Sequence, residues 1–240
     1  MNPCQLTIIS HYYNNHSFVI DQLEYWSRYR GLLRSAINFI LVDDCSSDKF
    51  DDELIAGYRE KLNLRLFRVT DDIAWNQGGA RNLGIFCSVT EWIILIDIDQ
   101  LLYESFLVDI VDGIQRGIFE PEVLYHFRIK ELVNIQNNES LIHHPNSYLV
   151  NRSKFLEFGM YDEDFVGGYG YEDVYLMKQW VYHGMRRSLI DKVSSEDLPF
   201  GTKSLDRDLS RNLKLAMDKI NSGEIVRSRG ILRFNWKAVF

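Results

Sequence analysis

Short apolar runs alternate with amphipathic segments along most of the chain. A short apolar run is typical of a strand that helices cover on both faces, because such a strand has few exposed positions. These runs predict strands at residues 6–10, 38–42, 64–69, 92–96, 123–129 and 148–150. The amphipathic segments predict helices at residues 17–29, 51–62, 80–89, 103–117 and 172–183. The alternation indicates an α/β protein with a Rossmann-like, mostly parallel sheet flanked by helices.

The composition is that of one globular domain. Of the 240 residues, 46% are hydrophobic and 25% are charged, which is enough apolar material for a sizeable core. No internal repeat or Pro/Ser-rich linker divides the chain, so we expect a single domain over residues 1–240. The formal net charge of -7 argues against non-specific binding to nucleic acid.

The cysteines and the first residues predict a cytoplasmic protein. Cys4, Cys45 and Cys87 are too few and too scattered for a disulfide framework or a zinc site, and we expect reduced thiols. The first residues lack the pattern of a signal peptide, and no window reaches the roughly 20 apolar residues of a membrane span.

Two carboxylates, Asp97 and Asp99, end the most apolar strand, residues 92–96. Alternate strand residues share a face, and open parallel sheets bind ligands beyond the carboxyl ends of their strands. Hard oxygen ligands of this kind select Mg or Mn and leave coordination positions for a substrate diphosphate. The pair therefore predicts a metal site, although two acids after a strand also suit a solvated turn.

Three further polar segments stand in a fixed order around this strand. Asp43–Asp48 follows an apolar strand, Asn76–Asn82 lies between the two strands, and Gly167–Asp173 comes later, after Gly159–Phe165. The ordered set resembles the family 2 type of nucleotide-sugar glycosyltransferases with the GT-A fold. Its last member also resembles the carboxy-terminal segment of galactosyltransferase-like enzymes. The resemblance spans about residues 5 to 190.

The resemblance implies an inverting, metal-dependent transferase. The expected reaction moves a hexosyl or N-acetylhexosaminyl group from a UDP-sugar to a hydroxyl of a glycan or glycoconjugate acceptor, with Mn or Mg as the cation. We expect a nucleotide-binding half at about residues 1–100 and an acceptor-binding half at about 101–200. A C-terminal helix and tail would follow at about 201–240.

The base pocket is expected at the ends of the first two strands. By the resemblance, Asp43 or Asp44 accepts a hydrogen bond from the uracil N3–H, and His11 to Asn14 form the opposite wall, with Tyr12 or Tyr13 stacked on the ring. The alternative for the acidic pair is an Asx turn that closes the strand.

Asn76, Gly79 and Arg81 mark a helix start that is expected to approach the nucleotide. Glycine lets the backbone come close to a ligand, and a helix amino terminus offers free N–H groups to anions. Arg81 could pair with a phosphate. Asp97 and Ile98 are expected to contact the donor as well. The alternative is a simple turn, with Arg81 in a salt bridge to a neighbouring acid.

Glu172 and Asp173 are the expected catalytic residues. Glycosyl transfer needs a carboxylate that takes the proton of the attacking hydroxyl, on the sugar face opposite the leaving diphosphate. By the resemblance, Asp173 is this base and Glu172 hydrogen-bonds the acceptor or the donor sugar. The alternative is a pair of ordinary first-turn acids, which the helix dipole also favours.

The rest of the metal shell has no clear histidine. Many enzymes of this kind use a histidine after the acidic pair, but His183 falls within a predicted helix and is expected to be structural. Asp197 is the candidate third protein ligand. His126, His143 and His144 lack metal-ligand spacing, and we expect them at the surface or in an acceptor loop.

The C-terminal tail, residues 225–240, mixes basic and large apolar residues. It suits either a strand pair packed on the domain or peripheral contact with an anionic membrane or a lipid-linked acceptor. Two other functions stay open for the whole chain. A sugar-nucleotidyltransferase would usually have a basic, glycine-rich loop after the first strand, which residues 10–15 are not, and a non-catalytic carbohydrate-binding module would not need the acids at 97, 99 and 173.

Overall fold

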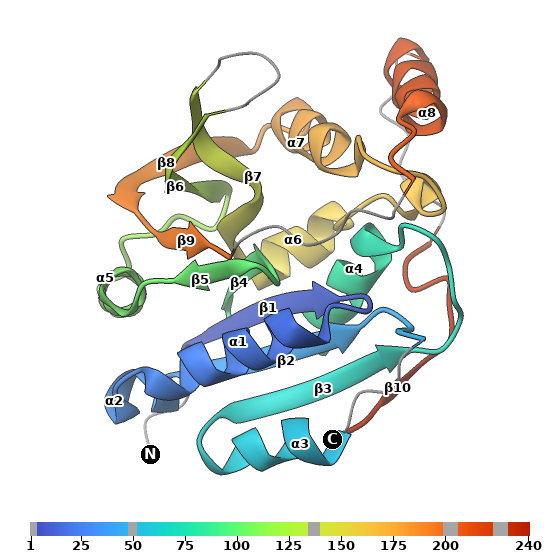
Figure 1. Ribbon diagram of the computed structural model, residues 1–240. Helices are drawn as coiled ribbons and strands as arrows, with labels where there is room; N and C mark the ends of the chain where they lie inside the picture. Colours follow the sequence, from blue (N-terminus) through green and yellow to red (C-terminus); the bar gives the residue numbers. More distant parts are fainter. Residues whose placement is uncertain (1–3, 48–51, 134–139, 199–205, 223–229) are drawn as a thin grey trace.

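One large mixed sheet forms the centre of the fold in the computed structural model (Figure 1). The structure describes residues 4–47, 52–133, 140–198, 206–222 and 230–240, without the side chains of 129–133, 140–143 and 197. In these residues the sheet strands are β1 (Leu6–Tyr12), β2 (Ile37–Asp43), β3 (Asn63–Val69), β4 (Trp92–Asp97), β6 (Val123–Val133), β7 (Ser140–Asn151), β8 (Arg186–Val193) and β10 (Trp236–Ala238).

The strands follow the order β10-β3-β2-β1-β4-β7-β6-β8. The central strands β3, β2, β1 and β4 are parallel, while β7 pairs antiparallel with both β4 and β6. The carboxyl ends of β1, β2 and β3 therefore point the same way (Figure 1). Two short strands, β5 (Gln100–Leu102) and β9 (Ser195–Asp197), form a separate antiparallel pair.

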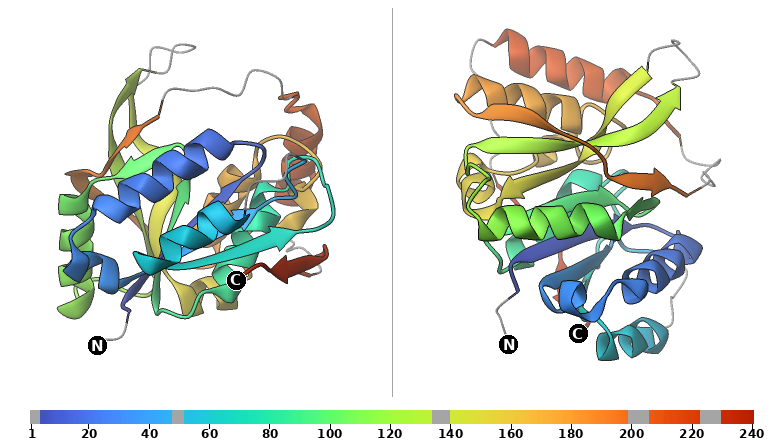
Figure 2. Two further views of the ribbon diagram at one scale, coloured as in Figure 1. Left: turned by 60° about the horizontal axis from the view of Figure 1, so that its bottom comes forward. Right: turned by 90° about the vertical axis from the view of Figure 1, so that its left-hand side faces the viewer.

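Helices cover both faces of the sheet (Figure 2). One face packs against α1 (His16–Arg28), α2 (Gly31–Ser35), α3 (Asp52–Gly57) and α5 (Glu104–Gln115). The other packs against α4 (Gln77–Cys87), α6 (Arg152–Phe158) and α7 (Glu172–Tyr182). The remaining helical segments are α8 (Ser210–Asn221) and two 3₁₀ turns, η1 (Tyr58–Glu60) and η2 (Glu163–Phe165).

Successive residues of β1 point to opposite faces of the sheet and contribute to a different hydrophobic core on each face. Ile8 belongs to the cluster that contains Trp26 of α1, and Ile9 to the cluster that contains Leu83 of α4. A Cβ at Gly84 would clash with Cγ2 of Ile9, so glycine allows α4 to pack closely on the sheet. This close packing fixes the start of α4 beside the ends of the parallel strands.

The predicted single α/β domain is confirmed, and the predicted strands and helices are present with shifted ends. The sequence patterns missed α2, α6, β5, β8 and β9, and predicted only residues 148–150 of β7. β8 escaped prediction because seven of its eight residues are exposed, so it has no apolar run.

In the tail, residues 236–238 form β10 and pair antiparallel with β3. Of the two alternatives for the tail, this is the strand pair packed on the domain. Residues 225–229 lie outside the described part of the chain, and membrane contact stays a prediction. None of the described helices is long and apolar enough to cross a membrane.

Candidate active site

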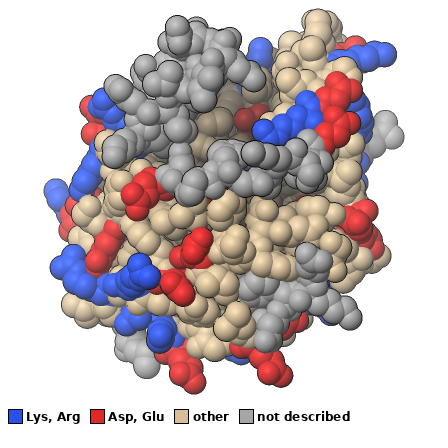
Figure 3. Space-filling model, viewed as in Figure 1, with Lys and Arg blue, Asp and Glu red and all other residues tan. Residues whose placement is uncertain are grey.

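A cleft of about 1170 Å³ lies beyond the carboxyl ends of the parallel strands. A hollow with acidic side chains inside it is visible in the upper half of Figure 3. The cleft is lined by the ends of β1 and β4, the loop before α4, the start of α7 and a segment that leads into α8. The predicted site residues that line it are His11, Tyr12, Tyr13, Asp44, Asn76, Asp97, Ile98, Asp99, Glu172 and Asp173.

Strand register brings the first of these together. The parallel pairing of β1 with β4 places His11 opposite Asp97, and the pairing of β1 with β2 places Tyr12 opposite Asp43. Burial and the neighbouring Arg81 lower the pKa of His11 to about 3, so this imidazole is neutral.

Asp97 is held from below by Arg81. The guanidinium, 1% exposed, donates to Oδ1 of Asp97 and, at 3.0 Å, to the hydroxyl of Tyr161. Tyr148 in turn donates to the same hydroxyl at 2.7 Å. Burial alone would raise the pKa of Asp97, but Arg81, His144, His11 and a hydrogen bond from Asn146 together outweigh burial, and the pKa is lowered. Arg81 therefore forms a salt bridge to a neighbouring acid. The sequence analysis gave this salt bridge as the alternative to a phosphate contact.

His144 of β7 contacts the other oxygen of Asp97. Its Nε2 lies 3.6 Å from Oδ2, while its Nδ1 accepts a hydrogen bond from the backbone N–H of Asn146 at 3.2 Å. Because Nδ1 accepts, Nε2 carries a proton, which faces the carboxylate. Sequence reasoning assigned His144 to the surface or an acceptor loop, and the pairing of β7 with β4 brings it into the cleft.

Asp99 lines the same cleft, and its carbonyl accepts a hydrogen bond from the N–H of Leu198 at 2.7 Å. This bond continues the β5–β9 ladder, in which Asp197 is opposite Gln100. The side chain of Asp197 lies outside the described residues.

The cleft offers carboxylate oxygens to a hard divalent cation. Among the described residues, no three His, Cys, Asp or Glu side chains form a group that could hold a metal ion by themselves. Mg usually takes one or two protein carboxylates, together with substrate phosphates and water. Asp99 in an open cleft suits that arrangement, and Asp97 stands beside it with its charge balanced by Arg81.

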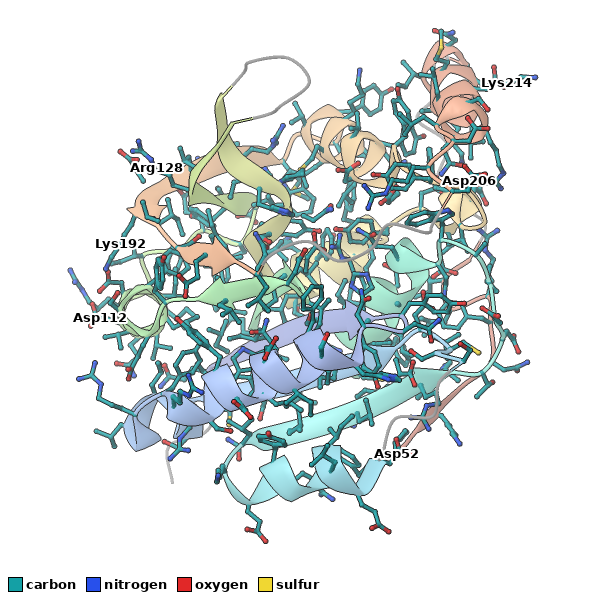
Figure 4. All side chains as sticks on the ribbon, viewed as in Figure 1. Asp52, Asp112, Arg128, Lys192, Asp206 and Lys214 are labelled. Carbon is teal, nitrogen blue, oxygen red and sulfur yellow. The ribbon has the colours of Figure 1, made fainter. Side chains whose placement is uncertain are left out.

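The two acids at the end of β2 have different environments. Asp43 accepts from Nε of Arg68 at 2.6 Å and from the N–H of Ser46 at 2.8 Å, so it supports the turn. Arg68 also pairs with Asp52 at the start of α3, which Figure 4 labels. Asp44 lines the cleft and accepts from Nδ2 of Asn76 at 2.7 Å. Burial raises the pKa of Asp44 to about 7.

Residues 11–14, the expected wall of the base pocket, differ in exposure and in their contacts. Tyr12 is 1% exposed, whereas Tyr13 is partly exposed and directs its hydroxyl to Asp72 at 3.4 Å. Asn14 donates its N–H to Oγ of Ser46 at 2.9 Å, which ties the β1–α1 loop to the turn after β2. Of the two tyrosines, Tyr13 has the more accessible ring.

Gly79 does not line the cleft. A Cβ there would clash with the side chain of Asn76 and would lie 2.6 Å from Cε1 of Phe234. The glycine therefore makes room for Asn76, which contacts Asp44, and for the tail.

Glu172 and Asp173 open α7 on the far side of the cleft. The chain enters the helix through Gly170 and Tyr171, with φ angles of +78° and +67°. Asp173 accepts a hydrogen bond from the N–H of Val174 at 2.7 Å. Burial and the adjacent Asp173 raise the pKa of Glu172 to about 7. A carboxylate pair with one member that titrates near neutral pH suits acid–base chemistry.

Two aromatic residues that sequence reasoning did not assign to a joint role connect the loops across the cleft. The rings of Trp75 and Tyr169 lie 4.6 Å apart between centroids, and Arg207 lies over Tyr169 at 5.8 Å. The N–H of Gly167 donates to the carbonyl of Ala74 at 2.9 Å. These contacts join the loop before α4 to the glycine-rich segment before α7.

α8 holds the glycine-rich segment in place. Nδ2 of the buried Asn212 lies within 3.0 Å of the carbonyl oxygens of Phe165, Gly168 and Gly170. Lys219 donates to Asp162 at 2.9 Å and to a second carboxylate nearby. The C-terminal helix is thus part of the frame of the site.

The fold is an α/β fold with a cleft beyond the carboxyl ends of its parallel strands and a carboxylate pair at one strand end. The model of the family described as "Glycosyl transferase family 2" matches residues 19–163, and the chain belongs to this family. No curated protein matches the chain.

Solved structures share the GT-A fold at low sequence identity. S. aureus TarS 1-349 in complex with UDP-GlcNAc matches with a TM-score of 0.71 and 14% identity, over 95% of this chain and 68% of that one. The mannosyltransferase PcManGT from Pyrobaculum calidifontis, in complex with GDP-Man and Mn2+, matches with a TM-score of 0.60 and 19% identity, over 81% and 57%. The catalytic domain of Drosophila beta1,4galactosyltransferase 7, complexed with xylobiose, gives 0.56 and 12%, over 85% and 74%. The chain spans 60% of another TarS 1-349 structure and 39% of a structure of TarS.

Proposed function

We propose that the protein is an inverting, metal-dependent glycosyltransferase that moves a hexosyl or N-acetylhexosaminyl group from a UDP-sugar to a hydroxyl of a glycan or glycoconjugate. The observation that carries the proposal is that the strand-end acids Asp97 and Asp99 and the helix-start acids Glu172 and Asp173 line one cleft. Membership of family 2 favours glycosyl transfer over nucleotidyl transfer. The similar folds with bound UDP-GlcNAc and with GDP-Man and Mn2+ support a nucleotide-sugar donor and a divalent cation.

The donor is proposed to bind on residues 1–100, with the acceptor on 101–200 and the tail helix as support. Asp44 faces the base pocket, and Tyr13 offers its ring to the base. Asp99 would hold the cation, which would supply Lewis-acid stabilisation of the leaving diphosphate. Asp97, fixed by Arg81 and His144, presents an ionised carboxylate to the sugar end of the donor.

The reaction is a single displacement. The acceptor oxygen forms a bond to the anomeric carbon as the bond from that carbon to the diphosphate oxygen breaks, and the anomeric configuration inverts. Asp173 takes the acceptor proton, and Glu172 hydrogen-bonds the acceptor or the donor sugar. One base suffices because the diphosphate leaves with the electron pair.

The test combines binding with a donor screen. Titration calorimetry of UDP with and without Mn tests the nucleotide and the cation, and we expect binding that depends on both. Released nucleotide from UDP-, GDP- and dTDP-sugars then identifies the donor. Failure to bind any of these nucleotides in the presence of Mn would contradict the proposal.

A further inference from the structure

A second cavity, of about 520 Å³, adjoins the cleft at the start of α7. Both cavities are lined by Pro145, Asp173 and Val174, so they meet at the proposed base. We call the second cavity the α7 groove. Its other lining residues are His126, Met177, Lys178, Val181 and Arg187.

One side of α7 forms the floor of this groove. The lining positions 173, 174, 177, 178 and 181 follow helical spacing and span about 12 Å along the axis. Val174 and Val181 are 46% and 54% exposed although they are apolar. Apolar side chains that line a groove, unlike single ones scattered on a surface, mark a binding site.

Two cations border this apolar floor, and neither has a carboxylate partner within the described part of the chain. No described Asp or Glu pairs with Lys178 or Arg187, whereas Arg186, the residue before Arg187, pairs with Glu120. Nε of Arg187 donates to Nε2 of His126 at 3.0 Å, which orients the guanidinium.

Other basic side chains of the same sheet edge are neutralised. Arg128 pairs with Asp191, and Lys192 with Asp109; Figure 4 labels both basic residues on this edge. Partial burial lowers the pKa of Arg187, although the residue stays largely exposed. A partly desolvated cation that no described carboxylate pairs with is stabilised by an anion from a ligand.

We propose that the α7 groove binds the acceptor, and that this acceptor is a sugar joined through a phosphate to an apolar chain. This inference rests on the proposed function, because it requires the acceptor hydroxyl at Asp173. The phosphate pairs with Lys178 and Arg187, and the apolar chain covers Val174 and Val181. A neutral glycan would leave both cations without a partner, and a polyanion without an apolar part would leave the valines exposed.

The test uses n-octyl phosphate as a probe, below its critical micelle concentration, with inorganic phosphate and n-octyl β-glucoside as comparison ligands. Calorimetry or NMR titration measures binding without turnover. We expect n-octyl phosphate to bind at least about tenfold more tightly than either comparison ligand, since only it carries both the charge and the chain. Equal binding of n-octyl β-glucoside would overturn the anionic acceptor, and equal binding of inorganic phosphate would overturn the apolar part.

Substitutions then locate the site. The double variant Lys178→Gln, Arg187→Gln and the single variant Val181→Asp should each weaken n-octyl phosphate binding at least about tenfold. All three side chains are exposed, so folding should be retained, and circular dichroism checks it. The matched control is Arg186→Gln, which changes the neighbouring arginine outside the groove and should bind the probe normally.

UDP affinity in the presence of Mn separates this inference from the proposed function. Intact UDP binding with no n-octyl phosphate binding, or with binding unaffected by the groove variants, would overturn the acceptor inference alone. Loss of UDP binding in the unmodified protein would instead count against the proposed function.

Discussion

Arg81 lies beneath the cleft and donates to Asp97, while its own side chain is 1% exposed. The first acid of the strand-end pair is therefore ionised and fixed before any ligand arrives. Its neighbour Asp99 lines the open cleft. Two acids of similar sequence context thus have different surroundings, and the one that Arg81 orients is the first of the pair.

Arg81→Met should destabilise the fold strongly. Removal of Arg81 leaves the mostly buried Asp97 without its cationic partner, and breaking a buried pair in this way costs about 3–5 kcal/mol of unfolding free energy. Urea denaturation measures this loss. The control is Arg116→Met, which breaks an exposed helix pair with Asp112 and should cost about 0–1 kcal/mol. Adding Asp97→Asn to Arg81→Met should recover part of the loss, and strict additivity of the two changes would contradict the pairing.

Asp99→Ala should greatly weaken UDP-sugar binding that depends on Mn or Mg, without unfolding the domain. In the proposed function this residue shares the cation with the diphosphate, and it lines the cleft. Calorimetry with and without the cation measures the effect. Unchanged affinity and unchanged metal dependence in the folded variant would remove Asp99 from the metal site.

UDP should bind better than CDP, by at least about tenfold at fixed Mn. A carboxylate accepts from the uracil N3–H, a bond worth about 1.5–3 kcal/mol when one partner is charged, and the cytosine ring lacks this hydrogen. Asp44 lines the cleft, whereas Asp43 is engaged by Arg68, so Asp44→Asn should reduce the preference. Equal dissociation constants for UDP and CDP would remove this role.

Local sequence patterns predict much of the fold but only some of the residues that line the candidate site. The central strands have apolar runs because both faces are buried, so residues 38–42 and 92–96 predicted β2 and β4. The acids at the ends of these strands were predictable too. Ligands of an open parallel sheet bind beyond the carboxyl ends of the strands, and the end of an apolar run marks that position in the sequence. β8 and the first residues of β7 have no such run, and their position depends on pairing with distant strands.

Long-range contacts explain what the sequence patterns missed at the site. His144 reaches Asp97 only because β7 runs antiparallel beside β4. The choice between Asp43 and Asp44 depends on Arg68 in a different strand. Gly79 faces Phe234, which is more than 150 residues away in the sequence. None of these relationships leaves a local signal.

The contributions of Asp44 and Glu172 to stability should fall as pH rises from about 4 to about 7. Burial raises the pKa values of Asp44 and Glu172 to about 7, so the folded state keeps protons that the unfolded chain releases near pH 4. The stabilisation is complete below the unfolded pKa and is lost as pH rises through the folded pKa. Each group contributes a slope of up to about 1.4 kcal/mol per pH unit.

Chemical denaturation at several pH values measures this slope. Asp44→Asn and Glu172→Gln should each flatten it, because an amide does not titrate. The control is Asp112→Asn, which changes an exposed carboxylate. An unchanged slope in both amide variants would show that these carboxyls titrate normally in the folded protein.

Asp173→Asn should lower turnover by roughly 10²- to 10⁴-fold, the range typical of lost general-base catalysis. Donor affinity should change little, because the lost function acts on the acceptor proton in the transition state. Glu172→Gln is the matched comparison: it removes the neighbouring carboxylate, and its smaller effect on turnover would distinguish a hydrogen-bonding partner from the base. With a single displacement, an α-linked donor must give a β-linked product, which the coupling of the anomeric proton in NMR reports. Near-normal turnover by Asp173→Asn, or a product that retains the α configuration, would show that the base or the mechanism is wrong.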